Sequence, residues 1–173
     1  TFYLTAGDVI VKDIPAGTTH DVIVYSLGQI DVQSPVVDIT NAIFLAANGL
    51  RLNGNLCINV PGSCDDPPPI LPDILPYPAL VSEGDIIQAS SAITVYGNIF
   101  ASSGDPLNPL TINLNPIHLH GVVIGDVVEI QGGAGTEYTD DLNPAYYALM
   151  PGFDYPDDLI TSQTIPGGWL EIE

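Results

Sequence analysis

The sequence predicts an all-β chain that folds as a parallel β-solenoid (β-helix) with short rungs. Apolar residues alternate with other residues in triplets separated by Gly, Asn, Ser and Pro, from residue 29 to 60 and again from 85 to 130. Successive strand side chains point to opposite faces, so each triplet is typical of a very short half-buried strand. In the first run the triplets recur about every six to eight residues, which suits a chain that turns a corner after each strand. A β-sandwich or jelly-roll uses similar strands and is the alternative fold.

Composition agrees with this fold class. The 173 residues include 16 prolines and 17 glycines, which argue against long helices, and 46% of them are hydrophobic, enough for one full core.

We expect one β domain over residues 1–173, with a proline-rich arm at 65–79 and an irregular C-terminal extension at 133–173. One short helix is expected, opened by Asp141 or Asn143 before Pro144. The expected strands are residues 2–4, 9–11, 22–24, 30–32, 37–39, 43–45, 50–52, 56–58, 93–95, 99–101, 112–114, 117–119, 122–124 and 169–172.

The segment from residue 65 to residue 79 is rich in proline. Because proline removes a backbone donor and fixes φ at about −65°, we expect an extended surface arm rather than a ladder strand or a helix. Its apolar side chains need cover, either from the chain's own domain or from a neighbouring subunit. These side chains are Ile70, Leu71, Ile74, Leu75 and Tyr77.

The charge is strongly one-sided. Twenty-one acidic residues face only two basic ones, Lys12 and Arg51, and the formal net charge is −19. Such a polyanion repels phosphate, so we do not expect nucleic acid or anionic lipid as partners, and divalent cations are the natural counter-ions. No stretch approaches the roughly 18 to 20 apolar residues of a membrane span.

Carboxylates grouped in expected loops suit Ca²⁺, although none of these groups has the residue spacing of an EF-hand loop. The candidate Ca²⁺ ligands are Asp140, Asp141, Asp157 and Asp158.

Two cysteines, Cys57 and Cys64, lie on either side of a turn that contains Pro61-Gly62. This spacing predicts a disulfide that closes a small loop, with two free buried thiols as the alternative, and two cysteines are too few for a zinc cluster. A disulfide implies an oxidising compartment, so we expect the chain to be extracellular or on the cell surface. The sequence begins at Thr1 without Met, as in a processed mature chain or a piece of a longer one.

One segment has the pattern of a metal site. His118 and His120 project from the same face of an expected strand, close enough to share a metal ion with a carboxylate or with His20. The segment from Asn115 to Gly121 resembles the His-Pro-x-His-Leu-His-Gly-His motif of multicopper oxidases, with Asn115 and Val122 at the first and last His positions. A working oxidase needs many more ligands and a far longer chain. The alternative is that the pair forms a partly exposed polar face of one strand.

The triplets from Gly28 to Gly49 and from Gly84 to Ile99 resemble the rungs of filamentous-haemagglutinin-type β-helices. Those are secreted bacterial surface proteins built as long right-handed parallel solenoids, so the resemblance implies a fibre-forming surface protein. Subunits of extracellular fibres joined by donor strands offer a second analogy. It rests on the apolar, strand-like ends of this chain: Phe2, Tyr3 and Leu4 at the start, and Trp169 near the end.

These observations lead us to expect an extracellular structural protein, not an enzyme, that assembles with copies of itself into a filament, fibre or surface layer. Adhesion or a biofilm matrix is the setting that such a polymer suits. One alternative is a secreted carbohydrate-binding module or polysaccharide-active enzyme, although no pair of carboxylates stands out as catalytic. The other alternative is a small metal-binding β-protein centred on the two histidines.

Overall fold

The computed structural model describes residues 2–12, 18–33, 37–60, 78–90, 92–115, 117–131 and 137–139. The chain divides into two compact units, Thr1–Leu142 and Asn143–Glu173, and all described residues belong to the first. Several predicted features therefore lie outside the described residues: most of the proline-rich arm, nearly all of the C-terminal extension, the short helix and the strand at 169–172.

The described residues form sixteen strands arranged on three faces. One face contains β1 (Phe2–Thr5), the second half of β3 (Thr18–Ser26), the second half of β5 (Val37–Ala46), β8 (Pro78–Ser82), β11 (Asn98–Ala101) and β14 (Val123–Gly125). A second face contains β2 (Val9–Lys12), β4 (Ile30–Gln33), β6 (Leu50–Asn53), β9 (Ile86–Ser90), β12 (Thr111–Leu114) and β15 (Val127–Ile130). The third contains the first halves of β3 and β5, then β7 (Leu56–Ile58), β10 (Ile93–Tyr96), β13 (Ile117–His120) and β16 (Glu137–Thr139).

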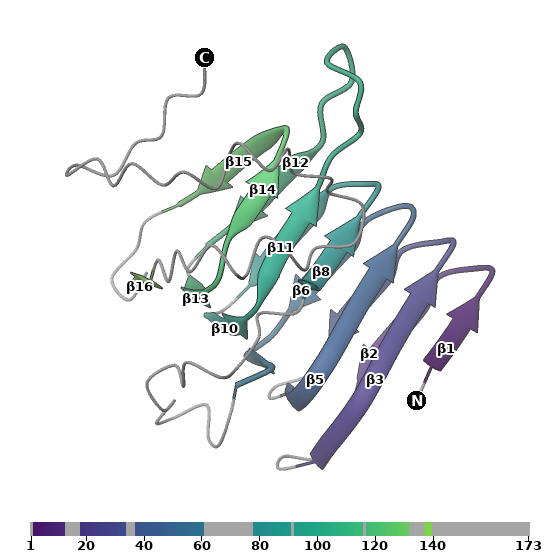
Figure 1. Cartoon of the computed structure of the whole chain (residues 1–173), viewed down its shortest axis with the longest axis vertical. Coiled ribbons are helices and arrows are strands. Elements are labelled where there is room, and N and C mark those ends of the chain that lie inside the picture. The colour runs from purple at the N-terminus through teal and green to yellow at the C-terminus, as the bar shows by residue number, and fades with distance from the viewer. Residues whose placement is uncertain are drawn as a thin grey trace, which may run out of the picture. The chain divides into compact units, whose positions relative to one another are not determined.

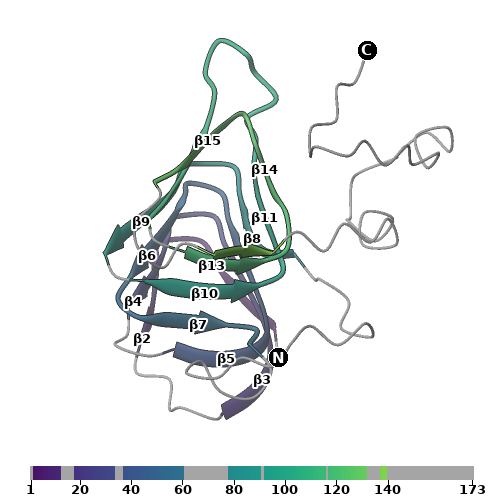
Figure 2. The same ribbon diagram turned by 90° about the vertical axis from the view of Figure 1, so that its left-hand side faces the viewer.

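Strand β5 joins two of these faces because it is long enough to turn a corner. Its first residues pair with β7, whereas Phe44, Leu45 and Ala46 pair with β8. The first and third faces are therefore one continuous ten-stranded sheet, and the second face is a separate six-stranded sheet. Figure 1 shows the strands of the first face stacked side by side, and Figure 2 shows the three faces of the rungs.

Every described strand pairing is parallel, and each strand pairs with strands of the neighbouring turns. Register partners on the early turns lie 20 or 21 residues apart, as in Phe2 with Ile23 and Ile23 with Ile43. The step from Phe44 to Leu80 is 36 residues, because the chain between β7 and β8 contains the proline-rich segment. This arrangement confirms the predicted parallel β-solenoid. It differs from a sandwich, whose sheets are antiparallel.

The core runs along the inside of the stack as ladders of apolar residues in register. In the six-stranded sheet, Ile30, Leu50, Ile86 and Ile112 follow one another across four strands, and all are fully buried. Each side chain packs on the one in the turn below, so every added turn buries more apolar surface. The described part of the chain contains no helix long and apolar enough to cross a membrane.

The predicted strands at 30–32, 50–52, 56–58, 93–95 and 112–114 bury both outer residues of the triplet. The triplet at 43–45 behaves differently. Phe44 is fully buried, whereas Ile43 and Leu45 are half-buried on the outer side. Phe44 is aligned with buried Val24 and Leu80, so the register across strands decides which side of an all-apolar triplet faces inward.

The corners between the first and second faces stack on one another through small residues and hydroxyl groups. Ser26 donates from its hydroxyl to the carbonyl of Gly7 (2.7 Å) and accepts from the N–H of Gly28 (3.0 Å). Ser82 repeats this role, because its hydroxyl accepts from the N–H of Gly84 at 3.0 Å. A Cβ atom at Gly84 would lie 2.6 Å from the backbone of the corner below, so only glycine fits there.

Strands β8 and β16 lie outside both predicted runs of short strands. Strand β8 begins inside the predicted arm, because Pro78 and Ala79 are the last two residues of that arm and the first two of the strand. Proline is tolerated as the first residue of a strand, where its missing donor costs least. In β9, Gln88 interrupts the apolar pattern at a buried position, and its side-chain oxygen accepts a hydrogen bond from the N–H of Asn115 at 2.9 Å.

Candidate functional site

Two turns of the described solenoid have a neighbouring turn on one side only. The first consists of β1 and β2, which pair with β3 and β4. The last contains β14 and β15, which pair with β11 and β12. Among the described strands, the other edges of these four have no partner. Edge strands present a row of backbone donors and acceptors that can pair with another strand.

Tyr3 on β1 is a core position without a neighbour beneath it. It is aligned with Val24, and Val24 is aligned with Phe44. Val24 and Phe44 are buried, whereas Tyr3 is 56% exposed. Its neighbours Phe2 and Leu4 are 60% and 64% exposed. These are three of the residues that the sequence singled out for assembly, and they lie together on the open first turn.

The second strand of the first turn shows the same feature. Val9 and Val11 are aligned with the fully buried residues Ile30 and Val32, but they are themselves only half-buried. Ile10, which lies between them on the outer side, is 60% exposed. The open end of the core therefore spans both β1 and β2.

The last turn presents core positions as well. Val128 and Ile130 on β15 are aligned with Ile112 and Leu114, both fully buried. Val128 and Ile130 are each 41% exposed. Neither residue is among the assembly residues predicted from the sequence. The signal that could have found them is their spacing, which repeats the alternation of the strand before.

The outer side of the first face is apolar along its length. The residues aligned across its six strands are half-buried, except for the more exposed one on β1. They are Leu4, Tyr25, Leu45, Val81, Phe100 and Ile124. The triplet pattern implied alternation but did not reveal that both sides of this sheet carry apolar residues.

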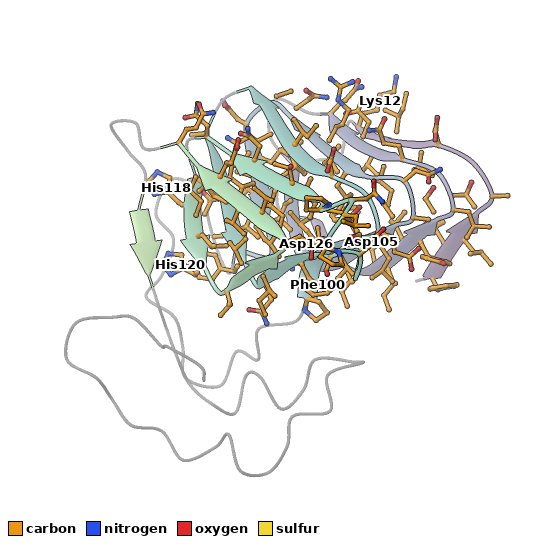
Figure 3. All side chains as sticks on the ribbon, turned by 90° about the horizontal axis from the view of Figure 1, so that it is seen from above. Lys12, Phe100, Asp105, His118, His120 and Asp126 are labelled. Atoms are coloured by element: carbon orange, nitrogen blue, oxygen red, sulfur yellow. The ribbon has the colours of Figure 1, made fainter. Side chains whose placement is uncertain are left out.

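The outer side of the second face is more polar and carries both basic residues of the chain, Lys12 and Arg51. Figure 3 shows Lys12 and Phe100 on opposite sides of the ribbon. The carboxylate of Asp31 accepts hydrogen bonds from the amides of Gln33 and Asn53, at 2.5 and 2.6 Å. Asp31 also stands beside Arg51 in register. This network links neighbouring turns on the solvent side.

His118 and His120 lie on the outer side of β13, as the sequence predicted. Ile117 and Leu119 alternate with them and are buried, while both histidines are half-buried. The ring of His120 stacks on the ring of Tyr96 in β10, with centroids 4.2 Å apart and an angle of 19° between the planes. Figure 3 shows both imidazoles on the side next to β16.

The loop of residues 102–110, between β11 and β12, is anchored by Asp126 at the corner between β14 and β15. The Asp126 carboxylate accepts hydrogen bonds from the Ser102 hydroxyl, from the hydroxyl and N–H of Ser103, and from the N–H of Leu110. These bonds, the one from Ser102 first, hold its pKa well below the ordinary value. The pKa of Asp105 is lowered by the side chain of Asn108 and then by the N–H of Leu107. The donors come from the loop itself, so they hold the loop together.

The structure describes only some of the other predicted site residues. Cys57 is fully buried beside Val60 and Tyr96 and is disulfide-bonded, while its predicted partner Cys64 lies outside the described residues. Among the side chains that the structure describes, no group of three His, Cys, Asp or Glu could hold a metal ion. The remaining candidates also lie outside the described residues: Asp140, Asp141, Asp157 and Asp158 for Ca²⁺, and Ile70, Leu71, Ile74, Leu75, Tyr77 and Trp169 for assembly.

Comparison of this chain with protein-family models, with curated proteins and with solved structures found no match. Its function must therefore be inferred from its own residues and their arrangement.

Proposed function

We propose that this chain is the subunit of a self-assembling extracellular filament, fibre or surface layer, joined end to end through its first and last turns. The observation that carries this proposal is Tyr3, a core position in register with Val24 and Phe44 that stays 56% exposed. A further turn must cover it, supplied either by a preceding segment or by a second copy. We propose the second copy.

Because every pairing is parallel, the strands at both ends of the stack run in the same direction. A copy added below β1 and β2 can present its own β14 and β15 there, and every strand would still run in the same direction. Main-chain hydrogen bonds would supply affinity, and alternating side chains would supply register. Because such a contact joins two different surfaces, it repeats without closing and produces a filament.

The side chains of the two ends are compatible with this contact. Continuing the inner ladders would stack Val9 and Val11 on Val128 and Ile130, so that partly exposed apolar groups become core. On the outer side, Lys12 would then lie beside Gln131 of the next copy and diagonally across from Glu129. One of only two basic residues would thus approach an acidic residue where two strongly negative subunits meet.

Two further observations support the extracellular setting. The disulfide at Cys57 is typical of proteins that fold in an oxidising compartment. The stacked parallel turns are also the architecture of the filamentous-haemagglutinin-type proteins that the sequence resembles. By this resemblance the polymer would act in surface attachment or in a matrix between cells.

The test is a matched pair of substitutions, followed by electron microscopy and sedimentation. Tyr3→Asp places a charge at the end of the core, and should raise the critical concentration for assembly at least about a hundredfold, because the interface would have to bury that charge. Leu107→Asp makes a similar change at a residue that is 87% exposed in the loop at 102–110, and should assemble normally. Deleting residues 1–5 should leave a folded domain that no longer polymerises.

Two results would reject the proposal. One is wild-type protein that stays monomeric at high concentration with and without Ca²⁺. The other is a Tyr3→Asp protein that is folded by circular dichroism and forms filaments as readily as the Leu107→Asp control.

A further inference from the structure

We propose that the corner formed by Thr5, Ala6 and Gly7 in the first turn is a contact surface for a second copy of this chain, and that it packs on the corner at Gly125 and Asp126 of that copy. This inference rests on the end-to-end assembly proposed above, and it names the residues and the repeat distance of the joint.

The described strands form complete turns. Each of the three faces contains six strand segments, from β1 on the first face to β16 on the third. The chain passes from the third face to the first at the end of every turn. A second copy that begins with its own β1 would therefore continue the winding without a gap. Its β1, β2 and first half of β3 could pair with β14, β15 and β16 at the same time.

The corners between the first and second faces bond to one another in a repeated way. In three successive turns, the N–H in the middle of the corner donates to a carbonyl of the preceding turn. These bonds are Leu27 to Thr5 at 3.0 Å, Ala47 to Ser26 at 2.9 Å and Glu83 to Ala46 at 2.9 Å. Ala6 holds this place in the first turn, which has no preceding turn among the described strands.

The next residue of each corner lies against the corner of the preceding turn. A Cβ atom at Gly28 would lie 2.6 Å from the backbone nitrogen of Asp8, and one at Gly84 would lie 2.6 Å from the backbone of Asn48. The third turn has Asn48 at this position, and its side-chain amide donates to the carbonyl of Leu27 at 3.3 Å. In all three turns, this position therefore contacts the turn before it.

Gly7 is the equivalent residue of the first turn, but the described part of the chain gives no reason for a glycine there. A Cβ atom at Gly7 would meet nothing within 4 Å. Gly7 is also not among the glycines with positive φ, so its backbone conformation does not require glycine. A corner of a second copy, packed on Gly7 as closely as Gly28 packs on the first turn, would require it.

The hydroxyl group of the corner shows the same difference. Ser26 donates to the carbonyl of Gly7 at 2.7 Å and Ser82 donates to that of Ala46 at 3.2 Å, so both reach the preceding turn. Thr5 is aligned with Ser26, but its hydroxyl donates within its own turn, to Gly7 at 3.3 Å. A second copy would offer Thr5 an acceptor of the kind that Ser26 and Ser82 already have.

The last turn supplies the matching corner. Gly125 ends the ladder of aligned residues that begins at Thr5. Its carbonyl is thus the acceptor to which the N–H of Ala6 in the second copy would donate. Only Asp126 lies between β14 and β15, and its carboxylate is already bonded to Ser102 and Leu110. This corner is therefore held in place before two copies meet, which lowers the entropic cost of the contact.

A joint of this kind fixes the repeat of the filament. Neighbouring strands lie about 4.8 Å apart, so six turns advance the filament by about 29 Å for each subunit. The same strand spacing continues across the joint, because the corners and the strands of the two copies pack as they do within one chain.

The experiment uses the full chain with Gly7→Ala or Gly7→Leu. Ala89→Ser is the matched control, because it also adds one heavy atom, at an exposed residue of β9 in a turn with neighbours on both sides. Sedimentation measures the critical concentration for assembly, and denaturant titration measures the stability of the monomer. Cryo-electron microscopy of the wild-type filament measures the axial rise.

We expect Gly7→Ala to raise the critical concentration about tenfold or more and Gly7→Leu to raise it further, because the added atoms overpack the joint. Monomer stability in both variants, and assembly of Ala89→Ser, should match the wild type. The axial rise should be about 29 Å.

Three results would overturn this contact and leave end-to-end assembly standing. They are a clearly different axial rise, a Gly7→Leu protein that assembles as readily as the wild type, and a Gly7→Ala monomer that is destabilised as much as a Gly84→Ala monomer. The last result would place a neighbour of Gly7 inside the chain. A wild-type protein that stays monomeric would instead overturn the assembly itself and this contact with it.

Discussion

The carboxylate of Asp126 accepts hydrogen bonds from both the backbone N–H (2.8 Å) and the hydroxyl (3.0 Å) of Ser103, which lies 23 residues earlier in the chain. The same oxygen accepts the N–H of Leu110 at 3.0 Å. One side chain at the corner of the last turn thus fixes both ends of the loop at 102–110. That loop interrupts the regular succession of strands between β11 and β12.

Replacing Asp126 with Asn should loosen this loop. An amide has one acceptor oxygen where the carboxylate has two, and the neutral group forms weaker hydrogen bonds. Amide hydrogen exchange at Ser103 and Leu110 should accelerate about tenfold. Asp105→Asn is the control, since it removes a charge from the same loop but leaves the bonds to Asp126. Unchanged exchange in the Asp126 variant would show that the corner does not hold the loop.

Acid should have the same effect as the substitution. The folded-state pKa of Asp126 lies below its ordinary value of 3.8. The stabilisation from its ionised form is therefore complete above that value, and is lost as the pH falls through the lowered folded-state pKa. The amide resonances of Ser103 and Leu110 should shift in that acidic range and stay constant from pH 5 to pH 7. The Asp126→Asn protein should lack this transition.

Gly84→Ala tests the stacked corners. The added Cβ would lie 2.6 Å from backbone atoms of Asn48 and Gly49, so one corner must move away from the other. We expect a loss of about 1–3 kcal/mol in the free energy of unfolding, measured by denaturant titration. Gly7→Ala is the matched control, because a Cβ there meets nothing within 4 Å. Equal stability of the two variants would contradict the close stacking.

Leu80→Ala tests the inner ladder of the first face. Leu80 is fully buried and stands in register between Phe44 and Ile99. Removing it should cost about 2–5 kcal/mol, since a cavity remains inside the stack. Leu107→Ala makes the same change at an exposed residue, and should alter stability by no more than about 0.5 kcal/mol. A small loss at Leu80 would place that residue outside the core.

Chelation should loosen the proposed polymer. Subunits of charge −19 repel one another when brought close, and bound divalent cations offset that repulsion. EDTA should therefore shorten or dissolve filaments at low salt and neutral pH, and added monovalent salt should weaken this effect by screening. Light scattering and electron microscopy measure it. Filaments that persist unchanged in excess EDTA at low salt would remove divalent cations from the assembly.

The sequence by itself determined most of the described strands and the fold class. Triplets such as Ile30-Asp31-Val32 and Leu50-Arg51-Leu52 alternate between apolar and polar residues, and the two sides of a strand are then distinguishable. It also placed His118 and His120 on one side of their strand, because that relation is local. The proposed assembly residues Phe2, Tyr3 and Leu4 were recognisable as an apolar strand near one end of the sequence.

Only the tertiary structure decided relations between strands. The triplet Ile43-Phe44-Leu45 is apolar throughout, so its inward side followed from register with Val24 and Leu80 rather than from its own pattern. Glu137 came beside His118 for the same reason, through the pairing of β13 with β16. Alternation along a strand is set by the geometry of the backbone. Alignment between strands depends instead on the length of the chain that connects them. Two connections are long here, the loop at 102–110 and the one that contains the proline-rich segment. The local pattern of residues does not show how such a connection sets the register of the next strand.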